Sequence, residues 1–166
     1  MKPPSRVRQM PILRVIARAL VPVILLFGLY VQFHGDFGPG GGFQAGVIFA
    51  AGLIIFALTF GAETLRQVVP VVLTERLMAA GVLLYGAVGV VAMFLGGEFL
   101  NYSALDPLTT GHYGQHLGII VIELGVGIAV AATIMRVYYA FVGRRTDEDR
   151  TGADPALDAG AGGEAS

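Results

Sequence analysis

The sequence predicts an all-α membrane protein with four transmembrane helices and with both termini in the cytoplasm. Two observations support this prediction: the apolar residues are gathered into four long runs, and the basic residues follow one side of the resulting topology. The chain of 166 residues is 55% hydrophobic and only 14% charged, whereas soluble domains carry about a quarter charged residues. A formal net charge of −1 and the lack of a basic patch away from the membrane flanks indicate no nucleic-acid partner.

Each of the four apolar runs is long enough to cross a membrane, which requires about 20 residues in helical form. Glu123 is the only charged residue in the interior of these runs. The first run reaches full length because the side chains of Arg14 and Arg18 can extend to the membrane surface. A cleaved signal peptide is the alternative there, but no Ala-x-Ala-like site follows the run. The predicted helices cover residues 12–33, 41–63, 76–97 and 116–141.

The basic residues all lie on one side of this topology. They flank the first helix, bracket the connection between the second and third, and follow the fourth, whereas residues 34–40 and 98–115 contain none. Because cytoplasmic connections carry the excess of Lys and Arg, both termini are expected in the cytoplasm and residues 34–40 outside. The basic residues are Lys2, Arg6, Arg8, Arg14, Arg18, Arg66, Arg76, Arg136, Arg144, Arg145 and Arg150.

The chain divides into three predicted regions: a cytoplasmic N-terminus at 1–11, a transmembrane domain at 12–143 and a cytoplasmic tail at 144–166. The tail is rich in Gly, Ala and Asp. It has too few apolar residues to offset the entropy lost on ordering, so it is predicted to be disordered.

The connection between the second and third predicted helices is expected to lie at the membrane surface. Pro70 should interrupt any helix there, and Thr74 is placed to cap the third helix. Glu63 and Arg66 are three residues apart and are expected to form a surface ion pair of small energetic value.

Glu123 is the leading candidate for ion chemistry, because a carboxylate inside an apolar helix is costly and usually faces a protein interior or a hydrated cavity. It lies about two turns inside the fourth helix, on the order of 10 Å. His116, seven residues earlier, shares nearly the same face and could handle protons, as could His34 on the outer side. The alternative is a neutral Glu123 that hydrogen-bonds to a neighbouring subunit and fixes assembly.

The remaining polar residues on the outer side do not predict a metal or catalytic site. None has the spacing of a known ligand motif, and the chain has no cysteine. Solvated loop residues, or a vestibule that attracts cations, are the expected roles. These residues are His34, Asp36, Glu98, Asp106, His112 and His116.

Residues 34–46, HGDFGPGGGFQAG, join the first two predicted helices with a dense run of glycine and proline. The run lacks the lysine and spacing of a phosphate-binding loop. Small residues at four-residue steps favour close helix packing, both at Gly42, Gly46 and Ala50 and at Gly125, Ala129 and Thr133. The segment is therefore interpreted as an assembly joint bordering an ion path. Its contributing residues are Pro39, Gly40, Gly41, Gly42, Gly46 and Phe43, which is expected to anchor against another helix.

Residues 39–46, PGGGFQAG, open a transmembrane helix after a short outer loop and resemble the MnhB (MrpB) family. These are small subunits of multi-subunit Na+/H+ antiporters of the Mrp type. The resemblance extends over roughly residues 15–142 and includes four helices, a basic inner loop and an acidic residue in the last helix. The family pattern often has Gly-His close to the proline and Asp at the acidic position, where this chain has His34 and Glu123.

The resemblance implies a multi-pass subunit in the cell (inner) membrane, surrounded by lipid and by other hydrophobic Mrp-type subunits. It implies transport of Na+ and H+ by the whole complex, with this subunit contributing to assembly and to the ion path. It implies no enzymatic activity and no cofactor bound by this chain. The alternative is an equivalent ion-module subunit in a membrane-bound hydrogenase or a complex-I-like respiratory assembly.

Overall fold

Five helices make up the described part of the chain, and four of them are long and apolar enough to cross a membrane. The computed structural model describes residues 11–35, 40–101 and 112–151, without the side chains at 112–115 and 145–151. The helices are α1 (Pro11–His34), α2 (Gly42–Phe60), α3 (Ala62–Val68), α4 (Val71–Phe94) and α5 (His112–Thr151). The predicted all-α class and the four membrane-spanning helices are confirmed.

One difference from the sequence prediction is at the start of α4. This helix begins at Val71, five residues before the predicted start, and Thr74 lies within its first turn instead of capping it. Pro70 is the residue before the helix, in an extended conformation (φ −66°, ψ 153°). A helix start tolerates the missing N–H of proline. The Thr74 hydroxyl instead donates a hydrogen bond to the Val71 carbonyl oxygen at 2.6 Å.

The region predicted as a tail begins within a helix, because α5 continues to Thr151. The predicted disorder of the rest of the tail and the predicted N-terminal region stay predictions, since residues 152–166 and 1–10 lie outside the described residues.

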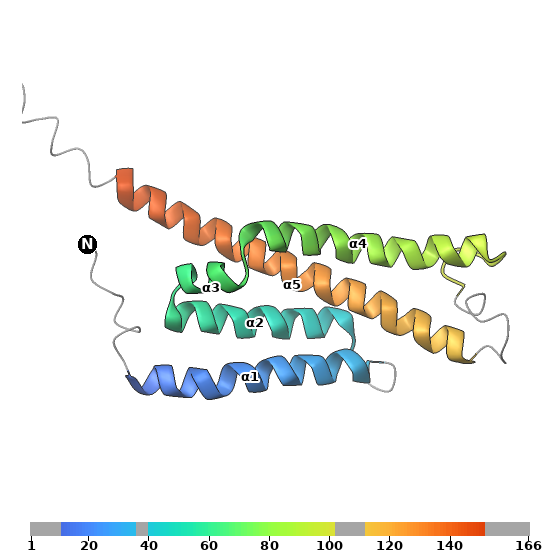
Figure 1. The fold of residues 1–166 in the computed structure, drawn as a ribbon, viewed down its shortest axis with the longest axis horizontal. Coiled ribbons are helices and arrows are strands. Elements are labelled where there is room, and N and C mark those ends of the chain that lie inside the picture. Colours follow the sequence, from blue (N-terminus) through green and yellow to red (C-terminus); the bar gives the residue numbers. More distant parts are fainter. Residues whose placement is uncertain (1–10, 36–39, 102–111, 152–166) are drawn as a thin grey trace, which may run out of the picture.

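The spanning helices lie in the order α1, α2, α5, α4, with α5 crossing the others diagonally (Figure 1). The most extensive contacts are those of α5 with α4 and α2, and those of α1 with α2. The helices cross closely because glycines at the crossing points have no side chain. A methyl group added at Gly46 would lie 2.6 Å from the Gly127 carbonyl oxygen, and one at Gly81 would lie 2.6 Å from that of Gly125.

The two predicted seams of small residues therefore pack within this chain. Gly42, Gly46 and Ala50 are buried in α2, and the first two meet α5. In the other seam, Gly125 and Ala129 meet α4, whereas Thr133 is exposed. Close approach of helix backbones at such residues is a common basis of packing in membranes.

One end of the bundle gathers the described arginines and is called here the arginine end (left in Figure 1). It contains the start of α1, the end of α2, α3, the start of α4 and the C-terminal part of α5. Arg18 lies over the Phe60 ring at 5.8 Å, which joins α1 to α2. Arg136 pairs with Glu75 at 3.0 Å, which joins α5 to α4. The opposite end, with Gly35 and Gly40–Gly42, is called the glycine end.

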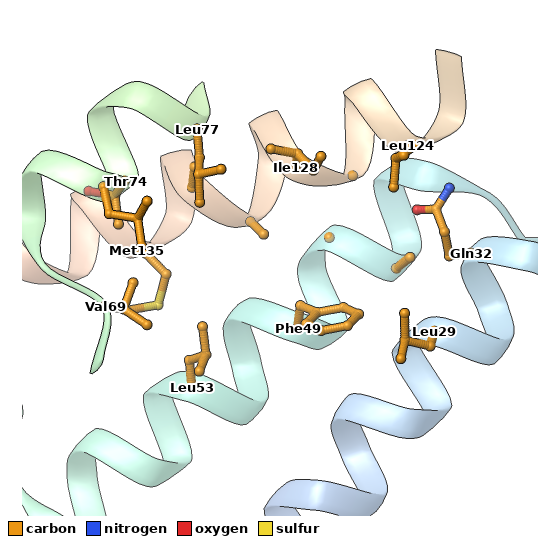
Figure 2. A pocket seen from close by; sticks show the side chains of 16 residues that line it. Leu29, Gln32, Phe49, Leu53, Val69, Thr74, Leu77, Leu124, Ile128 and Met135 are labelled. Atoms are coloured by element: carbon orange, nitrogen blue, oxygen red, sulfur yellow. The ribbon is translucent and has the colours of Figure 1, made fainter. Parts of the chain in front are cut away.

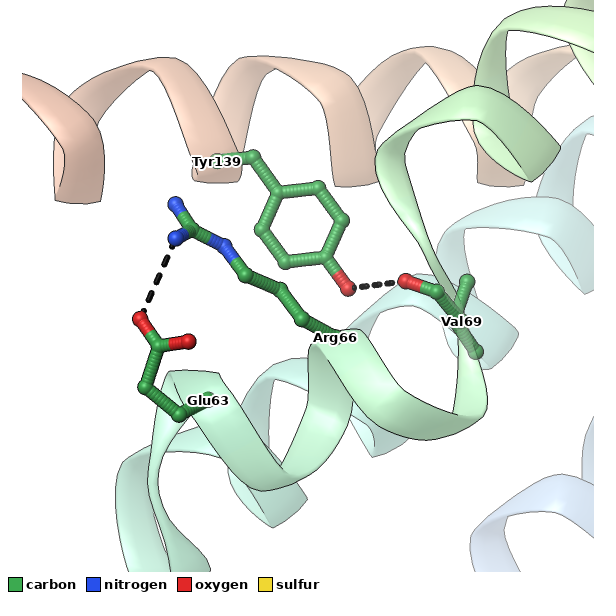
Figure 3. A network of polar contacts seen from close by, with 4 residues as sticks. All are labelled: Glu63, Arg66, Val69 and Tyr139. Atoms are coloured by element: carbon green, nitrogen blue, oxygen red, sulfur yellow. Dashed lines mark hydrogen bonds and ion pairs between the residues drawn. The ribbon is translucent and has the colours of Figure 1, made fainter.

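Tyr139 holds the short helix α3 against α5 at the arginine end (Figure 3). Its side chain is 2% exposed, and its hydroxyl donates a hydrogen bond to the Val69 carbonyl oxygen at 2.7 Å. The Arg66 guanidinium lies 5.6 Å from the centre of the Tyr139 ring. Arg66 also pairs with Glu63 at 3.1 Å, which confirms the predicted ion pair.

Candidate functional site

The carboxylate of Glu123 lies against the glycine-rich connection between α1 and α2. A methyl group added at Gly35 would lie 2.5 Å from Oε2 of Glu123, and one added at Gly41 would lie 2.9 Å from Oε1. The two carboxylate oxygens thus face backbone on both sides of that connection. Glu123 itself is half-buried in α5. The structure therefore brings together the two features that the sequence singled out separately.

Glycine is required at this contact for two reasons, conformation and space. Gly41 has φ +125° and ψ −177°, a region essentially closed to residues with a side chain. A methyl group at Gly42 would overlap the Glu123 carbonyl oxygen. Since Gly42 is the first residue of α2, the carboxylate lies near the positive end of that helix dipole.

Gln32 is a further polar group in this region, on α1 one turn before Gly35. Its side chain is only 5% exposed, and its Nε2 has no hydrogen-bond partner within the described residues. A methyl group at Gly127, one turn from Glu123 on α5, would lie 2.7 Å from Oε1 of Gln32. The sequence prediction did not include Gln32. The available signal was that it is the only amide side chain in the first apolar run.

The two candidate histidines occupy different positions. His34 is exposed, and its ring stacks on Tyr30 with ring centres 5.1 Å apart. His116 is half-buried on α5, seven residues before Glu123, which separates them by about 10 Å along the helix. Their proposed part in proton handling stays a prediction.

The rest of the predicted outer-side residues are partly described. Glu98 is exposed. Pro39, Asp36 and Asp106 lie outside the described residues, as does the side chain of His112. Across the part of the chain that is described, no three His, Asp or Glu side chains are grouped closely enough to hold a metal ion.

A cavity of about 270 Å³ extends from Gln32 along α5 to Thr74 (Figure 2). Its α5 wall runs from Leu124 to Met135, about 16 Å along the axis. The lining is otherwise apolar, and the Thr74 hydroxyl is already bonded to the Val71 carbonyl. The labelled apolar residues are Leu29, Phe49, Leu53, Val69, Leu77, Leu124, Ile128 and Met135. Gln32 is therefore the lining group in need of a polar partner.

Comparison with known proteins identifies a family and several relatives that match this chain over most of their length. The model of the MnhB family, described as a domain related to the MnhB subunit of Na+/H+ antiporter, matches residues 12–136. The relatives include "Putative antiporter subunit mnhB2" from Staphylococcus aureus strain Newman, 31% identical over 136 residues, which are 81% of this chain and 96% of the relative. The same protein from strains JH1 and COL matches with the same values. The chain therefore belongs to the MnhB family of Na+/H+ antiporter subunits and is a multi-pass membrane protein.

Proposed function

We propose that this chain contributes to both assembly and the ion path of a multi-subunit Na+/H+ antiporter, with Glu123 as the group that takes part in cation or proton passage. The observation that carries the proposal is the position of Glu123. Its carboxylate belongs to a membrane-spanning helix and lies against the glycine backbone of the connection between α1 and α2. Intramembrane carboxylates of this kind mark ion and proton pathways.

The proposed orientation places the arginine end in the cytoplasm and the glycine end outside. The described arginines lie at one end of the bundle, as the positive-inside rule requires for a cytoplasmic face. In this orientation Glu123 is reached from the outer side of the membrane. His116 and His34 then lie between Glu123 and the outer surface, where each can pass protons.

The proposed partners are other hydrophobic subunits of the antiporter. Large apolar side chains are exposed along α1 and α4, which form the two edges of the bundle. Phe43 is 63% exposed beside the glycine contact, so it is free to anchor against a neighbouring subunit. The glycines have a different part: Gly41, Gly42 and Gly46 shape the contact between α2 and α5 inside this chain.

Replacing Glu123 with Gln tests the proposed role of the carboxylate. The complex carrying Glu123→Gln should assemble, because the two side chains have the same shape, but Na+-dependent pH change in everted membrane vesicles should fall at least about tenfold. The matched control is Glu98→Gln, at an exposed position beyond the end of α4, which should exchange normally. Normal exchange by an assembled Glu123→Gln complex would contradict the ion-path role.

The proposal of an antiporter, in preference to a redox-linked assembly, rests on the relatives, whose names describe antiporter subunits. The proteins that co-purify with this chain in mild detergent test this choice. Antiporter subunits without a hydrogenase or NADH-oxidising arm are the expected result, and a redox arm would overturn it.

A further inference from the structure

Gln32 has a hydrogen-bond donor without a partner inside the described membrane-spanning part of the chain. Only 5% of its surface is exposed, and its Nε2 has no hydrogen-bond partner within the described residues. The lipid interior contains no water that could accept a hydrogen bond from this donor, and leaving it unpaired costs several kcal/mol. A group that accepts a hydrogen bond is therefore expected beside it.

The cavity described above supplies the space for that acceptor. Gln32 lines one end of this volume of about 270 Å³, and apolar side chains line most of the remainder. A water molecule takes about 30 Å³ and needs polar partners, so water is expected at the Gln32 end and not along the apolar walls. An N–H donor favours a water oxygen over a cation, since a cation offers no lone pair.

Gln32 and Glu123 lie on facing helices one turn apart. On α1, Gln32 is three residues before Gly35, which meets the Glu123 carboxylate. On α5, Glu123 is four residues before Gly127, which meets the Gln32 amide. These two contact points are thus offset by about one helical turn, roughly 5 Å along the α1–α5 interface. This offset is suited to a single bridging water.

We propose that Gln32 binds a water molecule at this end of the cavity and that this water exchanges protons with Glu123. The inference rests on the proposed function of Glu123. The proton that leaves the protonated carboxyl forms an O–H bond to the water oxygen. The same water releases one of its original protons to a second water hydrogen-bonded to it at this polar end of the cavity, so that it is regenerated and Glu123 becomes a carboxylate. Gln32 is a positioning residue in this step, because it touches the water and not the transported ion.

The test replaces Gln32 with Met in the assembled complex, because Met is similar in volume and removes the amide. Antiport in everted vesicles should fall about tenfold or more, the order of a lost proton-transfer partner. Gln32→Asn keeps a donor and leaves room for water, so it should retain more exchange than Gln32→Met. The control is Leu83→Met, a volume-conserving substitution at an exposed position of α4 outside the cavity, which should leave exchange unchanged.

A second readout is the density for water beside Gln32 in a high-resolution structure of the assembled complex. It should be present in the natural protein and absent in Gln32→Met. Full exchange by Gln32→Met would overturn the inference. The absence of that water in the natural protein would also overturn it, and this readout does not depend on whether Gln32→Met assembles. Loss of exchange in Glu123→Gln with full exchange in Gln32→Met rejects the water site and leaves the proposed function intact. Normal exchange in both rejects the proposed function as well.

Discussion

At the scale of single residues, the glycine-rich connection packs closely against the carboxylate of Glu123. Gly35 and Gly41 come from the two sides of the connection between α1 and α2, and each has room for no more than a hydrogen atom beside Glu123. The carboxylate is thereby placed next to backbone groups and close to the start of α2. A carboxylate in lipid would be far more costly, so the site depends on these glycines.

Gly41→Ala should destabilise the folded subunit by about 1–3 kcal/mol, because alanine is strained at this backbone conformation. Its methyl group would also lie only 2.9 Å from Oε1 of Glu123. The expected result is a lower yield of assembled complex and a lower midpoint of thermal unfolding in detergent. Gly86→Ala is the control, since nothing lies within 4 Å of a methyl group there. Equal yields and midpoints for both variants would show that Gly41 is not constrained.

At the scale of elements, α5 is the helix on which the others are arranged. It meets α2 through Gly46 and α4 through Gly81, and it carries both Glu123 and the Tyr139 contact to α3. The short helix α3 turns the chain between α2 and α4 and has its own contact to α5. Because Tyr139 bonds to the Val69 carbonyl, just after α3, this contact fixes the end of that turn.

Tyr139→Phe should loosen the connection after α3, because it leaves the Val69 carbonyl without its donor at a cost of about 1 kcal/mol. Trypsin cleavage after Arg66 in the detergent-purified complex should become faster, while the proposed ion path at the other end of the bundle stays intact. Tyr85→Phe is the control, because the Tyr85 hydroxyl has no hydrogen bond within the described residues. Unchanged cleavage in Tyr139→Phe would contradict this account.

At the scale of the whole molecule, the four spanning helices give the chain two chemically different ends. The arginine end is tied together by contacts between helices, including those of Arg136 with Glu75 and of Arg18 with Phe60. The glycine end contains the Glu123 contact and the polar end of the cavity. In the proposed function, ions enter at the glycine end and the charged groups of the arginine end anchor the subunit.

The absence of native cysteine allows a direct test of the proposed orientation. Glu98→Cys, at an exposed position towards the glycine end, should react with a membrane-impermeant maleimide added to intact cells. Thr64→Cys, at an exposed position of α3, should react only in everted vesicles. Each variant serves as the control for the other, and the reversed pattern of labelling would overturn the orientation.

The sequence by itself determined the number of spanning helices and the charge difference between the two ends, and it singled out Glu123 as the only charged residue in the interior of the apolar runs. These features follow from local composition, because a run of about 20 apolar residues suffices to define a span. It predicted the ends of the helices less well: Pro70 does separate α3 from α4, as expected, but α4 begins directly after it at Val71 and not at the predicted residue 76.

Only the tertiary structure decided which groups meet. The contact of Glu123 with the glycine segment joins residues about 80 positions apart in the chain, and the burial of Gln32 depends on how α1 lies against α5. Hydropathy does not specify how helices cross, since any apolar face is satisfied by lipid or by protein. The crossings are set by where small residues let two backbones approach, and those pairs are formed only in the folded bundle.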